Sequence, residues 1–246
     1  MRKVVAANTP RYGLARVLSK RGLCSRTEAE RWIRAGRVQV AGRVVLDPEH
    51  PTALDATSIA VDGAAAHAVD SVFLALNKPR GLVTTAQDER GRDTIYRCLE
   101  GLDLPWLAPA GRLDQASEGL LLLSNDPAFN AAVTEPRTPL HKTYHVQVEG
   151  LADDALLQRL RAGVLDAGEL LQVVRIERLR GGERRTWLEM VLDEGRNRQI
   201  RRLLAAVGLV VLRLVRVSIG PVQLGDLAKG AVRPLSADEV RLLRGA

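Results

Sequence analysis

The sequence has few of the residues that carry several common kinds of chemistry. It contains two cysteines, Cys24 and Cys98, and neither belongs to a Cys-x-x-Cys or Cys/His spacing. We therefore expect no disulfide framework and no zinc site. A Gly-rich phosphate-binding loop is also missing, so we predict a protein that uses neither a metal nor a cofactor.

Aromatic residues and long apolar runs are scarce as well. The chain holds 3 Trp, 3 Tyr and 2 Phe among 246 residues, which is too few for a sheet that stacks several bases, as in an RRM. No stretch approaches about 18 uninterrupted apolar residues, and the start, MRKVVAANTPRYG, lacks the apolar segment of a signal peptide. We expect a cytoplasmic protein with no membrane partner.

Positive charge is concentrated at the start of the chain. Residues 1–50 contain eleven Lys/Arg and four Asp/Glu, an excess of +7, and the whole chain also has a net charge of +7. The rest of the sequence is therefore balanced. A basic module joined to a neutral body indicates that the first part binds a polyanion and the second part acts on it.

The first 62 residues have the pattern of a small helical and stranded domain. Apolar residues recur at helical spacing from Leu14 to Leu18, and Gly22 is placed to end that helix. Ser25 and Glu28 form a Ser-x-x-Glu capping box for a second helix. The alternating stretches VQV, RVVL and SIAVDG then predict short strands. We expect a domain over residues 1–62 and a linker over 63–71.

This first domain resembles the S4-type RNA-binding domain, in which paired helices and the following turn present basic side chains to structured RNA. The resemblance implies five RNA-binding residues: Lys20, Arg21, Arg26, Arg34 and Arg37. Their contacts with phosphates would give affinity with little choice of sequence. The alternative is that they only solvate helix faces, because Arg26, Glu30 and Arg34 are also spaced for i,i+4 ion pairs.

The remaining residues, 72–246, predict a larger α+β domain. Its first strand lies in VFLALNKPRGLVTT, and further strands are expected at 119–124, 142–149, 171–178, 185–192 and 209–219. Helices are expected at 127–134, 153–162 and 196–207. Strands outnumber crossover helices, which favours a mixed, largely antiparallel sheet.

The stretch GRLDQASEGLLLLSND places Asp114 just before an apolar run that predicts a buried strand. A carboxylate beside an apolar wall loses hydration unless a cation or hydrogen-bond donors compensate. From the residues alone, a simple Arg112 to Asp114 pair or a turn-stabilising aspartate is the favoured explanation of this pattern.

Four segments in order, NKPRGLVTT, GRLDQASEGLLLLSND, KTYHVQVEG and EGRNRQIRRLLAAVG, resemble the pseudouridine synthases of the RsuA/RluB/RluE group, which modify bacterial ribosomal RNA. The resemblance covers residues 14–240. It implies that Asp114 is the catalytic aspartate, that Tyr144 stacks on the target base and that Arg201 pairs with the aspartate. It also implies that Leu214 closes the substrate pocket, with Arg112 beside it. Without the resemblance, Tyr144 would be taken for a core residue.

The implied reaction suits these residue types. Uracil N1 separates from the sugar, the base turns, and C5 forms the new bond with loss of its proton, so no electron or group donor is needed. An ionised carboxylate can attack the sugar, attack the base or remove a sugar proton, and the resemblance does not choose among these roles. The target uridine must leave its stack, so we expect base flipping.

A second basic segment, EGRNRQIRRLLAAVGLVVLRLVR, has six arginines and no acid between Gly195 and Arg216. It predicts RNA contacts by Arg196 and Arg198, although an exposed amphipathic helix fits the same pattern. Lys78 and Arg80 are expected to be exposed loop charges.

We expect a monomer that acts on ribosomal RNA or a pre-ribosomal particle, with 23S RNA favoured over 16S RNA. Two other functions are compatible with the sequence. One is a non-catalytic RNA-binding factor in ribosome assembly, and the other is a nucleoside hydrolase that cleaves the same bond and releases uracil.

Overall fold

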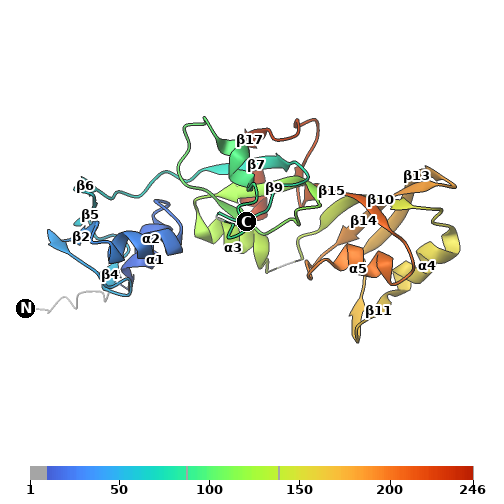
Figure 1. Cartoon of the computed structure of the whole chain (residues 1–246), viewed down its shortest axis with the longest axis horizontal. Helices are drawn as coiled ribbons and strands as arrows, with labels where there is room; N and C mark the ends of the chain where they lie inside the picture. Colours follow the sequence, from blue (N-terminus) through green and yellow to red (C-terminus); the bar gives the residue numbers. More distant parts are fainter. Residues whose placement is uncertain (1–9, 87, 138, 246) are drawn as a thin grey trace, which may run out of the picture. The chain divides into compact units, whose positions relative to one another are not determined.

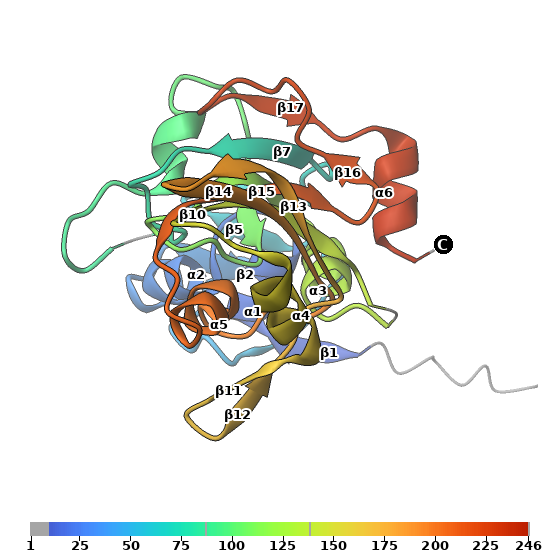
Figure 2. The same cartoon turned by 90° about the vertical axis from the view of Figure 1, so that its right-hand side faces the viewer.

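The structure is a computed structural model that describes residues 10–86, 88–137 and 139–245 (Figures 1 and 2). The start of the chain, residues 1–9, whose sequence lacks the pattern of a signal peptide, lies outside the described residues. Packing divides the described residues into two compact units, and the first consists of residues 10–72, 103–108 and 124–127. No described helix has both the length and the apolar character needed to cross a membrane.

The first unit has the predicted order of two helices followed by short strands. Its elements are β1 Arg11–Gly13, α1 Leu14–Lys20, α2 Arg26–Arg34, β2 Val38–Val40, β3 Arg43–Val44, β4 Pro51–Ala53, β5 Ile59–Val61 and β6 Ala64–Ala65. Strands β3, β2, β5 and β6 form one sheet in that order, and β1 pairs with β4. The stretch 63–71, expected to be a linker, instead contributes β6 and the buried residue Ala66.

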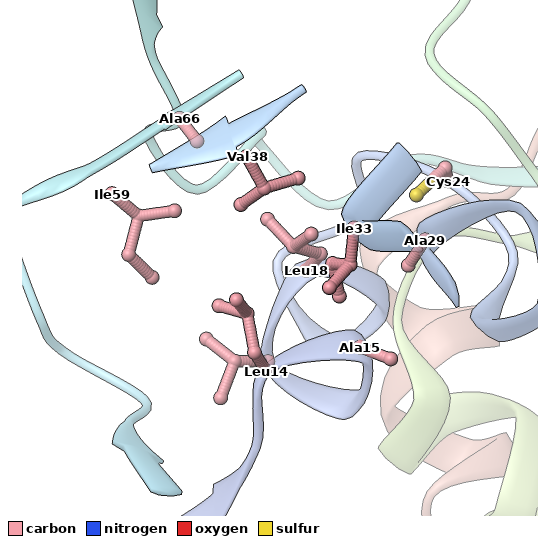
Figure 3. Close-up of a cluster of buried hydrophobic side chains, with 10 residues drawn as sticks. Leu14, Ala15, Leu18, Cys24, Ala29, Ile33, Val38, Ile59 and Ala66 are labelled. Carbon is pink, nitrogen blue, oxygen red and sulfur yellow. The ribbon is translucent and has the colours of Figure 1, made fainter. Parts of the chain in front are cut away.

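A single apolar core holds this unit together (Figure 3). Leu14 and Leu18 on α1 meet Ile33 on α2, and Val38 and Ile59 come from the sheet. Burying each large aliphatic side chain contributes about 1.5–3 kcal/mol. The helical apolar spacing in the sequence is therefore what joins the two helices to the strands.

The second helix begins at the predicted Ser25 cap, but the Glu28 carboxylate of the expected capping box pairs with Arg31. Ser25 accepts a hydrogen bond from the Glu28 amide at 3.0 Å, so it is the N-cap. The Glu28 carboxylate pairs with Arg31 at 3.1 Å, one turn further along the helix.

The second unit is built on one large mixed sheet, which confirms the predicted α+β class. Its strand order is β13-β14-β10-β15-β9-β7-β17, with β8 on β9 and β16 on β15. The strands are β7 Phe73–Lys78, β8 Ala108–Ala110, β9 Glu118–Ser124, β10 Lys142–Glu149, β13 Arg175–Gly182, β14 Arg185–Leu192, β15 Val211–Ile219, β16 Val222–Gln223 and β17 Val232–Pro234. Neighbours β13, β14, β10 and β15 are antiparallel, whereas β15 and β9 are parallel.

Helices and one small hairpin accompany the sheet. They are η1 Ile95–Leu99, α3 Pro127–Thr134, α4 Asp154–Ala162, α5 Gln199–Ala205, α6 Ala237–Leu243 and the hairpin of β11 Val164–Asp166 and β12 Glu169–Leu171. In both views α4 and α5 lie on one face of the sheet at β13, β14, β10 and β15 (Figures 1 and 2).

Two predicted elements begin later than expected. The strand expected at 171–178 runs over β13, because Ala167 and Gly168, with φ values of +50° and +81°, form a tight turn that pairs β11 with β12. The helix expected at 196–207 begins at Gln199, because Arg198 has a φ of +49°, which the interior of an α-helix does not accommodate.

Gly119 allows the parallel pair at the centre of the sheet. Its φ is +101°, and a Cβ atom there would lie 2.2 Å from the carbonyl oxygen of Arg216. Arg216 is its partner in the β9 to β15 register. Only glycine permits both this backbone conformation and this approach.

Candidate active site

Asp114 lies in the loop that connects β8 to β9. Its side chain is half-buried, with 37% of its surface exposed, and it lines a cavity of about 320 Å³. The Ser117 amide donates to the Asp114 carbonyl at 3.0 Å and closes a turn inside the loop. The cavity volume falls in the range of sites that bind small molecules or single bases.

The buried ammonium of Lys78 holds this loop in place. Lys78 is fully buried, and its Nζ donates to the carbonyl oxygens of Pro79 at 3.0 Å, Asp114 at 3.2 Å and Ser117 at 2.8 Å. Three acceptors use all three N–H donors of an ammonium. Burial lowers the pKa of Lys78 to about 8, although the Asp114 carboxylate acts in the opposite direction. The prediction that Lys78 is an exposed loop charge is therefore wrong.

The segment after Lys78 binds further backbone groups of the same loop. The Thr84 hydroxyl donates to the Leu113 carbonyl at 2.8 Å. The Gly81 amide donates to the Gln115 carbonyl at 2.7 Å, and the Gln115 side-chain amide donates back to the Gly81 carbonyl at 3.0 Å. The motif NKPRGLVTT thus holds the motif GRLDQAS in place through hydrogen bonds.

Two arginines from the start of α5 reach the Asp114 loop. Arg198 Nη1 lies 3.9 Å from Asp114 Oδ2, and Arg201 Nη2 donates to the Ala116 carbonyl at 3.1 Å. The structure therefore differs from the prediction that Arg201 pairs directly with the aspartate. Within 4.0 Å the ion pair belongs to Arg198, which was predicted to contact RNA, while Arg201 binds the loop backbone.

Arg201 still interacts electrostatically with the aspartate and has an unused donor. Burial and the nearby Arg198 lower the pKa of Arg201, whereas Asp114 raises it. The Arg201 Nε is buried and has no hydrogen-bond partner among the described residues. A buried unsatisfied donor is costly, by about 1–3 kcal/mol, so a bound oxygen acceptor in the cavity would be favoured.

Tyr144 and Leu214 come from neighbouring strands and line the same cavity. Tyr144 on β10 pairs with Arg216 on β15, and Val146 pairs with Leu214, so the tyrosine and the leucine project from one face. They are 8% and 6% exposed. The predicted alternation of β10 holds, because His145 lies on the opposite face.

Arg196 lines the cavity but is engaged in ion pairs. Its guanidinium binds Glu194 at 2.8 Å and Glu169 at 2.9 Å, and Glu169 also binds Arg202 at 2.8 Å. The hairpin β11–β12 therefore anchors the start of α5. An RNA phosphate would have to compete with these carboxylates for Arg196.

The cavity brings together all the predicted residues of the second unit, which are Arg112, Asp114, Tyr144, Arg196, Arg198, Arg201 and Leu214. Sequence reasoning missed the other lining residues, among them Leu192, Asn197 and Ile200. Asn197 could have been predicted from the sequence, since it lies within the GRNRQIR motif. Over the part of the chain that the structure describes, no cluster of three or more His, Cys, Asp or Glu could hold a metal.

In the first unit, Arg21 differs from its prediction as an RNA-binding residue. It is 8% exposed, and its guanidinium donates to the carbonyls of Leu54 and Ala66 at 2.9 and 2.6 Å, with a further bond to Ala56. Burial is the main cause of its lowered pKa. Arg21 therefore stabilises the domain and does not face solvent.

The other four predicted cations of the first unit remain accessible to different degrees. Arg26 and Arg34 share Glu30 at 3.6 and 3.5 Å, so the alternative i,i+4 pairing is present. Arg37 pairs with Asp62, and Lys20 lies 4.4 Å from the Tyr12 ring centroid. Arg34 is 65% exposed at its side chain, and such surface pairs are weak, about 0–1 kcal/mol, so RNA phosphates can compete for it.

Comparisons with known proteins agree with this architecture. Residues 72–206 match the RNA pseudouridylate synthase family, and residues 13–51 match the S4 domain. The chain belongs to the RNA pseudouridylate synthase family. The matched region of that family includes the loop with Asp114, the strand with Tyr144 and all of α5. The resemblance inferred from the sequence is thereby confirmed.

Individual relatives extend over nearly the whole chain. An uncharacterized RNA pseudouridine synthase of Mycobacterium tuberculosis is 41% identical over 92% of this chain and 91% of its own length. Ribosomal large subunit pseudouridine synthase B of Bacillus subtilis is 33% identical over 94% of this chain and 95% of its own. A crystal structure of a pseudouridylate synthase matches 95% of this synthase and 99% of its own chain, with a TM-score of 0.66 and 26% identity.

Proposed function

We propose that this synthase converts a uridine of large-subunit ribosomal RNA to pseudouridine, with Asp114 as the catalytic carboxylate. The observation that carries the proposal is the shared cavity, in which the half-buried Asp114 lies with Tyr144, Leu214 and Arg201. The relative from Bacillus subtilis, named for the large ribosomal subunit, supports 23S over 16S RNA. We further propose that the protein acts as a monomer.

We assign a role to each group around the base. Tyr144, which lines the cavity, stacks on the flipped uracil, an interaction worth about 1–3 kcal/mol for bases in other RNA-binding sites. Leu214 provides an apolar wall that excludes water. Arg198 and Arg201 place positive charge near the Asp114 carboxylate. The carboxylate could act at the sugar, at the base or as a proton acceptor.

The decisive experiment compares Asp114→Asn with the wild type on separately transcribed 23S and 16S RNA. Asparagine keeps the size of the side chain but removes its charge, so we expect no pseudouridine while the dissociation constant for RNA changes less than about threefold. Nucleoside chromatography measures pseudouridine and free uracil in the same sample. Unchanged modification by Asp114→Asn would refute the assignment.

The other outcomes separate the alternative functions. Free uracil without pseudouridine would indicate a nucleoside hydrolase, and RNA binding with neither product would indicate an assembly factor. Arg34→Ala is the matched control: it should weaken RNA binding and flatten its salt dependence while the single-turnover rate at saturating RNA stays unchanged. A lower rate would contradict the division of labour between the two units.

A further inference from the structure

We propose that a second RNA-binding site lies on the sheet face opposite Tyr144, where Trp187 and nearby arginines bind an unpaired nucleotide of the substrate RNA. The site is a hollow of about 400 Å³ with its own set of lining residues: His145, Leu179, Arg180, Trp187, Arg213 and Val215. The inference rests on RNA as the substrate of the proposed function. It does not depend on which group catalyses the reaction.

The strand register places these side chains on one face. Gln147 on β10 pairs with Trp187 on β14 and with Arg213 on β15, and Trp187 also pairs with Arg180 on β13. Directly paired residues project from the same face of a sheet. Tyr144 projects from the other face, on which α4 and α5 lie (Figures 1 and 2). The hollow and the candidate active site are therefore on opposite faces of the same strands.

Trp187 has the surroundings of a base-stacking platform. The ring is half-buried, and the guanidinium carbons of Arg180 and Arg213 lie 5.5 and 5.6 Å from its centroid. Indole rings stack on nucleobases without sequence preference, and adjacent guanidinium groups bind phosphates. A volume of about 400 Å³ lies in the range of sites that enclose small ligands.

The charges at the hollow favour a polyanion. Arg180 contacts the Trp187 ring, and no ion pair within 4.0 Å is recorded for it among the residues that the structure describes. Arg213 binds Glu118 at 3.0 Å, and Glu118 also binds Lys229 at 2.6 Å, so this trio retains one positive charge. Burial raises the pKa of Glu118, but these two partners outweigh it and lower the pKa to about 2, so the acid stays ionised and paired.

The hairpin of β13 and β14 extends the positive surface. Residues 175–185 contain five arginines and two glutamates, but Arg175 pairs with Glu189 at 2.5 Å and Arg178 pairs with Asp154 at 3.3 Å. Counting these two acids as well leaves an excess of +1. A protein partner with an acidic surface is less favoured, because the centre of the hollow is an aromatic ring suited to a base.

The test compares variants on two transcripts: a ribosomal RNA fragment that the wild type modifies, and the same fragment trimmed to the target stem. Arg180→Ala should weaken binding to the longer fragment about tenfold, lower the salt slope by about one and leave kcat unchanged. Trp187→Ala should have a similar effect, whereas Trp187→Phe, which keeps a ring, should lose less than about threefold. Binding to the trimmed stem should not change.

Arg159→Ala is the control, because it removes one exposed arginine from α4, which lies on the other sheet face. Equal binding by Arg180→Ala and Arg159→Ala to the longer fragment overturns the proposal. So does normal binding to naked RNA combined with lost activity on ribosomal particles, since that result would identify a protein partner. If the wild type formed no pseudouridine, the proposed function would fail, and the same variants would then be compared on a ribosomal RNA fragment that the wild type binds, so this inference would still be decided.

Discussion

Replacing Lys78 with methionine tests whether a buried cation positions the catalytic loop. The substitution keeps the length and apolar stem but removes the three donors to Pro79, Asp114 and Ser117. All three carbonyls lose the ammonium donor, but the Asp114 carbonyl keeps its bond from the Ser117 amide, so the cost falls on the other two, at about 1–3 kcal/mol each. A loop displacement of about 1 Å can cost about a hundredfold in rate. We expect the rate to fall about ten- to a hundredfold.

Two opposing contributions set the change in stability. The pKa of Lys78 falls from 10.5 to about 8 on folding, which means that the fold disfavours the ammonium by about 3 kcal/mol. Methionine removes this penalty and so offsets much of the cost of the two carbonyls. The free energy of unfolding of Lys78→Met should therefore remain within about 3 kcal/mol of the wild type.

Stability and activity should change in opposite directions as the pH rises. Because the folded pKa lies below the unfolded one, the unfolded chain holds more protons between pH 8 and 10.5, and the free energy of unfolding rises with pH in this window. Activity should fall in the same window, because a neutral amine has two N–H donors for three carbonyls. Lys78→Met should show neither the rise nor this decline.

Single-turnover release of tritium from 5-tritiated uridine in RNA measures the rate, and urea unfolding at pH 7 and pH 9 measures stability. Arg159→Met, which removes an exposed arginine from α4, is the control. Wild-type activity in Lys78→Met, or a loss of activity that merely follows a loss of fold, would refute the positioning role.

Three other substitutions have clear expected outcomes. Gly119→Ala should destabilise the second unit by about 2–5 kcal/mol in urea unfolding, because it combines a positive φ with a backbone clash, and a smaller effect would contradict the register at Arg216. Ala41→Asn should stabilise the first unit by about 0.5–1 kcal/mol, since Ala41 has a φ of +50° in a turn where asparagine is preferred. An unchanged or lower Tm in thermal unfolding of the full chain would contradict this prediction. Arg198→Ala should reduce the single-turnover rate about tenfold at saturating RNA, because it removes the cation nearest Asp114, whereas an effect on RNA affinity alone would make Arg198 only an RNA contact.

The sequence determined the local structure and indicated the groups that we propose to react. Periodicity located both helices of the first unit and the alternation of β10, because these patterns depend on neighbours within one turn or one strand. Helix α6 was missed although Ser236 and Glu239 form a complete capping box, so the signal was present in the sequence. The order of motifs identified the family and placed Asp114, Tyr144 and Arg201 in one site.

Only the tertiary structure decided how charged side chains are used. Lys78 reaches Ser117, 39 positions away, and Arg21 reaches Ala66, 45 positions away, so both cations are buried where their local sequence suggested exposure. Arg198, and not the predicted Arg201, pairs with Asp114, and this depends on the left-handed backbone of Arg198 at the start of α5. The hollow at Trp187 depends on the pairing of four strands. The environment of a long charged side chain is set by backbone groups distant in sequence, which local patterns do not encode.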